Sequence, residues 1–177
     1  MPPADWTDRT LRDLIHHIVD DHHAFTRRTL AELVPLANEV ARDHGGRHPY
    51  LLEVHSLLRE LQDDMQAHLA AEEQVLFPFI EELDIASRAG GGHRRTSEGK
   101  VLDGQIMGLL YEHNHAGDVL GVLRSTTKGY AVPADADDRY RALFEGMAAL
   151  EADLQLHLEL EEQVLLPRAR ALTRAKR

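Results

Sequence analysis

The chain has 177 residues, a natural length for a single domain, and its net charge of −10 disfavours nucleic acids and anionic membranes as partners. It contains no cysteine, which excludes disulfides, thiolate metal ligands and cysteine nucleophiles. Apolar residues make up 43% and aromatic residues 5%, and no apolar run approaches the roughly 20 residues that span a bilayer. We therefore expect an all-α, cytoplasmic protein with no membrane segment.

Two amphipathic helices are predicted in the first half of the chain. The apolar residues of 11–40 recur at steps of three or four, with Thr10 and Asp13 as a start signal and Gly45 as a stop signal. A second row of the same kind covers 51–79. Each row predicts a helix with one buried face.

An exposed loop and two more helices are predicted in the second half. The Gly-, Ser- and Arg-rich segment 86–100 is typical of a loop. Helical rows follow at 102–123 and 140–165, separated by Gly129 and Pro133.

Four amphipathic helices without a strand pattern favour an up-down-up-down antiparallel four-helix bundle. We expect one domain over 1–177, with the bundle at about 11–172. Pro35, Pro78 and Pro167 interrupt the helical rows, so we expect kinks at these positions.

The chain repeats an eleven-residue motif. H-L-A-A-E-E-Q-V-L-F-P at 68–78 returns as H-L-E-L-E-E-Q-V-L-L-P at 157–167, and each copy follows a histidine pair, in D-D-H-H-A at 20–24 and E-H-N-H-A at 112–116. The spacing from the upstream histidine to the motif is nearly equal in both cases. This repeat indicates two helix hairpins related by a pseudo-twofold axis.

The repeated motif places a histidine and a glutamate on the core face of its helix. Residues four apart lie on the same face, as do His68 and Glu72, or His157 and Glu161. Buried carboxylates need a partner, and the core rows supply no Lys or Arg nearby. A bound cation is the obvious partner, and imidazole with carboxylate suits iron, zinc, manganese or copper.

Two metal ions are predicted from the number of donors. One ion would take His23 and His68, the other would take His113 and His157, and both would share two bridging carboxylates. The predicted ligands are His23, His68, Glu72, His113, His157 and Glu161. Residue types alone do not distinguish iron from zinc or manganese. A bundle that uses these residues structurally, without a metal, is the alternative.

Three other histidines are left open as contributors to the centre. His22 and His115 are adjacent alternatives to His23 and His113, but they fit the helical rows less well. His44 lies too far along an uninterrupted helix to share the site unless the helix folds back.

Several of these motifs resemble those of hemerythrin-like di-iron proteins, above all the iron-sulfur cluster repair family, also called repair of iron centres. They are the two copies of H-x-x-x-E-E-Q-V-L, together with E-H-N-H-A-G, V-A-R-D-H and P-R-A, and the resemblance covers about 11–172. It implies a four-helix bundle with a non-haem di-iron centre, oxo- or hydroxo-bridged. It also implies the same six ligands: His23, His68, Glu72, His113, His157 and Glu161.

The resemblance also implies a function. A repair-type protein would react with nitric oxide, oxygen or peroxide and donate iron to a damaged iron-sulfur protein, with help from an electron donor. The alternatives are a sensor or carrier that binds oxygen or nitric oxide reversibly, and an enzyme that consumes these molecules. The ligands alone do not decide among them.

Two departures from related patterns bear on these expectations. The adjacent cysteines that repair proteins carry in an N-terminal domain have no counterpart here, so we expect no thiol-dependent step. Oxygen-carrying hemerythrins have a further histidine where this chain has Gly117, which predicts space beside one metal and disfavours reversible oxygen carriage.

Overall fold

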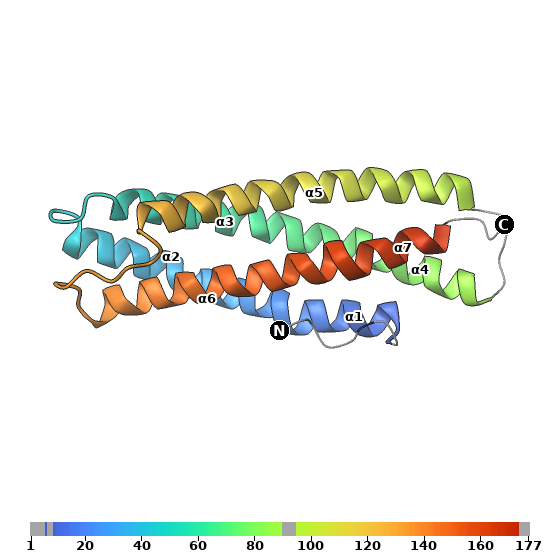
Figure 1. Ribbon diagram of the computed structural model, residues 1–177, viewed down its shortest axis with the longest axis horizontal. Helices are drawn as coiled ribbons and strands as arrows, with labels where there is room; N and C mark the ends of the chain where they lie inside the picture. Colours follow the sequence, from blue (N-terminus) through green and yellow to red (C-terminus); the bar gives the residue numbers. More distant parts are fainter. Residues whose placement is uncertain (1–5, 7–8, 90–94, 174–177) are drawn as a thin grey trace. The chain divides into compact units, whose positions relative to one another are not determined.

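The computed structural model describes residues 6, 9–89 and 95–173, and all regular secondary structure in these ranges is helical (Figure 1). The elements are α1 (Leu11–His17), η1 (Ile18–His23), α2 (Ala24–His44), α3 (Leu51–Ala71), η2 (Glu72–Leu76), α4 (Phe77–Arg88), α5 (Arg95–Thr126), α6 (Asp138–Leu160), η3 (Glu161–Leu165) and α7 (Leu166–Thr173), where η marks a π-helical segment. The all-α helical bundle class is confirmed.

The four predicted helical rows correspond to four uninterrupted runs of helix in the described ranges. These runs are α1 to α2, α3 to α4, α5 alone, and α6 to α7. The predicted loop at 86–100 was too long, because α4 continues to Arg88 and α5 begins at Arg95. In the last turn of α4, Arg88 pairs with Asp84 one turn earlier, at 2.8 Å. Residues 90–94 lie outside the described part.

The chain divides into two compact units, each with its own apolar core. Unit 1 comprises Met1–His23, His68–His113 and Gln155–Arg177, and unit 2 comprises Ala24–Ala67 and Asn114–Leu154. The helices α3, α5 and α6 contribute residues to both units.

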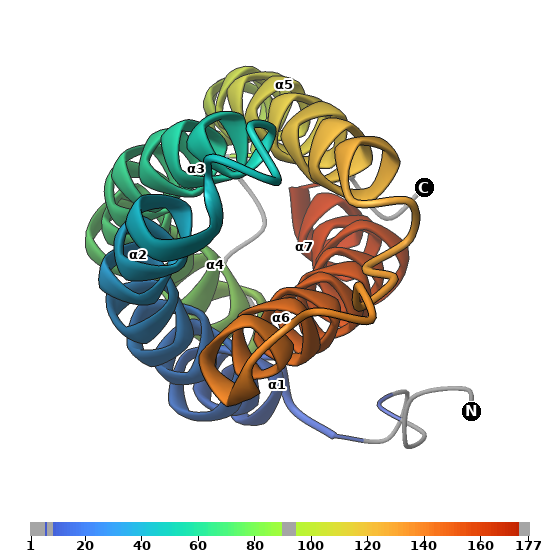
Figure 2. The same ribbon diagram turned by 90° about the vertical axis from the view of Figure 1, so that its left-hand side faces the viewer.

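Unit 2 is built from α2 and parts of α3, α5 and α6 (Figure 2). Its core consists mostly of aliphatic side chains. The two aromatic rings of Tyr140 and Phe144 are fully buried there and meet edge to face at 4.9 Å. The hydroxyl of Tyr140 lies 2.6 Å from that of Tyr50. Two helix connections meet at this end, since His48 lies 3.0 Å from Asp135.

Unit 1 packs α1 against α4 and α4 against α7 (Figure 1). Fully buried aliphatic side chains from several helices fill its core, among them Leu14, Ile18, Ile80, Leu102 and Ile106. Burying each such side chain contributes about 1.5–3 kcal/mol relative to its exposure. No helix in the described residues is long and apolar enough to cross a bilayer.

The predicted start and stop signals lie at the two ends of the first helical run, α1 to α2. Thr10 and Asp13 form a capping box, in which Asp13 N–H donates to Thr10 Oγ1 at 3.0 Å and Thr10 N–H donates to Asp13 Oδ2 at 3.2 Å. At the other end, a Cβ on Gly45 would lie 2.3 Å from the Ala41 carbonyl oxygen. Only glycine fits that close approach.

The start of α6 gives a prediction about acid stability. Asp137 accepts a hydrogen bond from Tyr140 N–H at 2.9 Å and lies 3.2 Å from His44 Nε2. These contacts lower the pKa of Asp137 to about 2. A depressed carboxyl pKa adds stability above the unfolded value of about 3.9, and this contribution is lost as the pH falls toward about 2.

We therefore expect Asp137→Ala to lower the free energy of unfolding at pH 7, with a deficit relative to wild type that shrinks as the pH falls below about 4. Urea unfolding at several pH values measures this deficit. Asp138→Ala, at the exposed next position, is the control and should show a smaller change, because no hydrogen bond or ion pair holds its carboxylate in the described residues. A deficit for Asp137→Ala that stays constant down to pH 3 would contradict the role of its carboxylate.

Candidate metal centre

The six predicted ligands all lie in unit 1, and none is more than 3% exposed. They come from four helical runs: His23 from η1, His68 from α3 with Glu72 from η2, His113 from α5, and His157 from α6 with Glu161 from η3. The structure thus brings together the six side chains that the repeat singled out.

A π-helical turn begins at each of the two glutamates. Phe77 N–H donates to the carbonyl of Glu72, and Leu166 N–H donates to that of Glu161, which are i to i−5 bonds. Each wide turn ends just before a motif proline, which has no N–H to donate to the turn behind it. Kinks were expected at all three prolines: Pro78 and Pro167 lie two residues after the ends of π-helical segments, in α4 and α7, whereas Pro35 lies inside the continuous α2.

Glu72 faces two histidines on different helices. Its Oε2 lies 3.3 Å from His23 Nε2 and 3.5 Å from His68 Nε2. Glu161 is placed in the same way, with Oε2 at 3.2 Å from His113 Nε2 and Oε1 at 3.1 Å from His157 Nε2. All four imidazoles therefore direct Nε2 toward the two carboxyl groups.

The donor atoms form two groups of four that share both glutamates. One group contains His23 and His157, the other contains His68 and His113, and within each group the donor atoms all lie within 4.8 Å of one another. The predicted pairing of His23 with His68, and of His113 with His157, is wrong. Each group takes one histidine from each hairpin: His68 and His113 come from the second and third helical runs, and His23 and His157 come from the first and fourth.

In three of the four histidines, the other ring nitrogen, Nδ1, donates a hydrogen bond to a further carboxylate, which we call an outer carboxylate. Nδ1 of His23 lies 2.8 Å from Glu73, Nδ1 of His68 lies 2.7 Å from Glu112, and Nδ1 of His113 lies 2.9 Å from Glu162. Nδ1 of the fourth, His157, has no hydrogen-bond partner in the described residues. Such contacts fix the ring orientation and direct the lone pair of Nε2 at the centre.

These outer carboxylates were not predicted, although the sequence holds a signal for them. Glu73 and Glu162 occupy the same place in the two motif copies, directly after the buried glutamate. Both lie on the edge of the buried stripe and look like ordinary surface charges from periodicity alone.

The two buried glutamates have opposite pKa shifts. Burial, together with the neighbouring Glu161 carboxylate, raises the pKa of Glu72 well above its ordinary value. Burial acts the same way on Glu161, but the nearby His157 and His113 outweigh it and hold the pKa of Glu161 well below its ordinary value. The side chains alone therefore favour a proton on Glu72, because two carboxylates this close repel each other.

Burial favours, for two of the imidazoles, the neutral form that binds metals. It lowers the pKa of His23 to about 4, with His157 adding to the effect and Glu73 opposing it. It lowers the pKa of His68 as well. For His113 burial is outweighed by Glu161 and Glu162, and the pKa is raised.

The donor set fits a pair of metal ions. Both carboxyl oxygens of Glu72, both of Glu161, and Nε2 of His68 and of His113 are buried without a hydrogen-bond partner in the described part of the chain. Leaving one such buried group unpaired costs about 1–3 kcal/mol. Cations between the carboxyl groups would satisfy all of these atoms at once.

The three histidines left open do not belong to either donor group. His22 is buried beside the centre, with its ring nearly parallel to that of His157 at 5.8 Å. His44 lies in unit 2 next to Asp137. His115, also in unit 2, forms an exposed cluster with Glu60 and Asp64.

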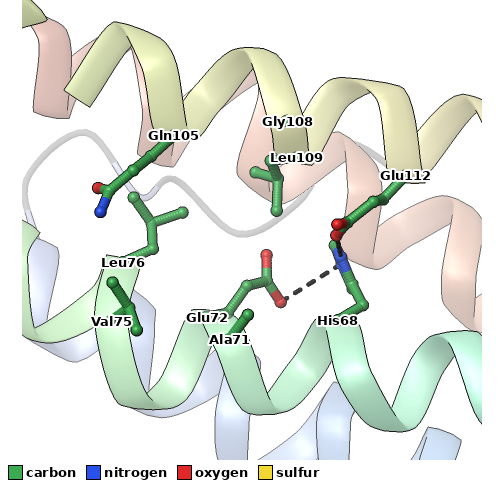
Figure 3. A pocket seen from close by; sticks show the side chains of 9 residues that line it. All are labelled: His68, Ala71, Glu72, Val75, Leu76, Gln105, Gly108, Leu109 and Glu112. Atoms are coloured by element: carbon green, nitrogen blue, oxygen red, sulfur yellow. Dashed lines mark hydrogen bonds and ion pairs between the residues drawn. The ribbon is translucent and has the colours of Figure 1, made fainter. Parts of the chain in front are cut away.

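A pocket of about 200 Å³ reaches the centre at His68 and Glu72 (Figure 3). Its walls come from α3, η2 and α5, with Val75, Leu76 and Leu109 as apolar lining. Glu112 and Gln105 add polar groups, and Gly108 faces Glu72 across the pocket in Figure 3. Gly117, beside which we expected space, does not line this pocket. The α5 residues that line it all precede His113, whereas Gly117 follows it.

Comparison with known proteins finds similarity over nearly the whole chain. Residues 14–169 match the family described as "Hemerythrin HHE cation binding domain". Proteins named "Iron-sulfur cluster repair protein YtfE" from Enterobacter sp. (strain 638) and Salmonella typhimurium are 32% identical over 94% of this chain and 70% of their own length. The protein of that name from Escherichia coli O1:K1 / APEC is 31% identical over the same shares.

The unpaired oxygens of Glu72 give a prediction about the metal-free protein. Glu72→Leu removes a buried acid and adds apolar volume, so we expect the metal-free variant to unfold at a temperature a few degrees higher, equivalent to about 1–3 kcal/mol. Circular dichroism after dialysis against chelator measures this, with the exposed Glu82→Leu on α4 as control. A lower unfolding temperature would show that the carboxyl group stabilises the fold by itself.

Proposed function

Because the chain belongs to the hemerythrin HHE cation-binding domain family, we propose that its six buried side chains bind two iron ions and that the protein acts in iron-sulfur cluster repair. The observation that carries this proposal is the pair of four-donor groups that share Glu72 and Glu161. Each ion would receive two imidazole nitrogens and two carboxylate oxygens. An octahedral ion would keep about two positions for other molecules.

The charges around the centre support a pair of multivalent cations. Glu72 and Glu161 face the donor space, while Glu73, Glu112 and Glu162 contact the histidines from behind. These carboxylates offset the charge of two divalent or trivalent ions. The four imidazoles disfavour calcium and magnesium, which prefer oxygen ligands.

The pocket supports a reaction with small neutral molecules. Nitric oxide, oxygen and hydrogen peroxide fit a space of about 200 Å³ with an apolar wall. Glu112, whose side chain is 52% exposed, places negative charge beside the pocket and disfavours anions. When bound, an iron pair supplies redox chemistry toward these molecules. Leu76 and Leu109 exclude bulk water from the side chains that hold the ions.

The relatives named for iron-sulfur cluster repair support the biological role. In this role the protein donates iron to a damaged iron-sulfur protein, after reduction by an electron donor in the cytoplasm. A sensor or carrier would use the same centre but would hold its ions through each binding cycle. Retention of iron therefore separates the two functions.

The test of the repair function is iron content followed by iron release. Protein purified from iron-replete cells should contain two irons per chain and absorb visible light. After anaerobic reduction, it should lose iron to a chelator within minutes and rebuild the cluster of an apo-ferredoxin, whereas the oxidised protein should not. Full retention of iron through reduction, with reversible spectral changes on adding and removing nitric oxide, would favour the sensor or carrier. Absence of iron would refute both functions.

Blocking the pocket should slow access without removing the metal. A Cβ at Gly108 meets nothing within 4 Å, and Gly108 lines the pocket, so Gly108→Leu adds an apolar side chain at the pocket wall. We expect the rate of spectral change on mixing with nitric oxide to fall severalfold at unchanged iron content, measured by stopped flow. Gly104→Leu is a matched control, since Gly104 lies one turn away on α5, is equally open and does not line the pocket. Equal rates in both variants would show that the molecule enters elsewhere.

A further inference from the structure

The outer contacts of the four histidines follow a rule set by the sequence repeat. The residue after each shared glutamate contacts one histidine: Glu73 accepts from His23, and Glu162 accepts from His113. These two contacts are equivalent under the repeat. They give each donor group one histidine that is held by a carboxylate.

The second pair of outer contacts breaks the rule. Glu112, directly before His113, accepts from Nδ1 of His68 at 2.7 Å. The equivalent residue, directly before His23, is His22, and the histidine it should support is His157. One donor group therefore has two outer carboxylates, and the other has one.

The structure shows what stands in place of the missing carboxylate. The imidazole of His22 is 4% exposed and lies nearly parallel to that of His157, with 8° between the ring planes and 5.8 Å between their centroids. Nδ1 of His157 is buried and has no hydrogen-bond partner in the described residues. A ring stacked in this way does not accept a hydrogen bond from that nitrogen.

An aromatic stack holds His22 in this place. The ring of His17 meets His22 edge to face at 5.2 Å, and the indole of Trp6 stacks on His17 at 4.8 Å. Arg168 donates to the carbonyl oxygens of Trp6 and Arg9, which ties this segment to α7. The stacked position of His22 is thus fixed by its neighbours.

Outer hydrogen bonds matter for metal affinity. A carboxylate on the far nitrogen orients the imidazole and makes its metal-binding nitrogen more basic, and loss of such a partner typically costs 10–100-fold in affinity. His68 and His113 both have this support, whereas His157 lacks it.

We propose that the two metal positions are unequal, and that the one held by His23 and His157 binds its ion more weakly and is emptied first. This inference rests on the proposed metal pair. The pocket reaches the other position, at His68. A repair protein reacts with small molecules and also donates iron, and the two positions would divide these tasks. The firmly held ion binds small molecules, and the weakly held ion is released.

Exchanging the residue types of His22 and Glu112 tests whether the two metal positions differ in affinity. Metal-depleted full-length protein is titrated anaerobically with ferrous ions against a competing chelator, and circular dichroism confirms that each variant is folded. Wild type should bind two ions in two steps that differ about tenfold or more in dissociation constant. His22→Glu should tighten the weaker step about tenfold and leave the tighter step unchanged, while Glu112→His should weaken the tighter step by a similar factor.

His22→Leu is the control for packing, because it fills the same space without an acceptor, and it should leave the weaker step weak. Two equal steps in wild type would overturn the inference and leave the proposed metal pair intact. So would a gain of affinity in His22→Leu that matches His22→Glu, or an unchanged tighter step in Glu112→His. Binding of fewer than two ions by wild type would instead refute the metal pair itself.

Discussion

The burial of two carboxyl groups side by side is the constraint on which the rest of unit 1 depends. Glu72 and Glu161 are almost completely buried, and Nε2 atoms of four histidines lie within 3.5 Å of their oxygens. Such an arrangement is unfavourable for side chains alone, since it raises the pKa of one carboxyl group and leaves oxygens of both without a hydrogen-bond partner in the described residues. Two π-helical turns, each beginning at one of these residues, position them toward the same space. A bound cation would offset the charge of both carboxyl groups.

The internal repeat explains both the symmetry of the centre and its departures from symmetry. Each motif copy provides a histidine, a shared glutamate and the following outer carboxylate, so these parts are equivalent. Residues outside the motif are free to differ, and the exchange of a carboxylate for His22 on one side is such a difference. The pocket beside His68 is a second one. Under the proposed metal pair, two donor groups that derive from the same repeat can therefore differ in affinity.

Much of this architecture was predictable from the sequence, because helices with one apolar face have a clear period. The six inward side chains were also predictable, since each interrupts an apolar row with a polar group. The grouping of His23 with His157 was not, because it depends on which helices meet in space. The outer carboxylates looked like solvated charges, and the helical period does not reveal the ion pair in the last turn of α4.

Because the carboxyl oxygens of Glu72 and Glu161 have no hydrogen-bond partner in the described residues, the stability of the protein would depend on bound metal ions. A chain that folds around two buried acids is less stable without cations, and bound ions add stability by mass action. Marginally stable chains open more often and are degraded faster in cells. Under the proposed metal occupancy, iron starvation would thus reduce the abundance of this protein through proteolysis, with no need for a dedicated regulator.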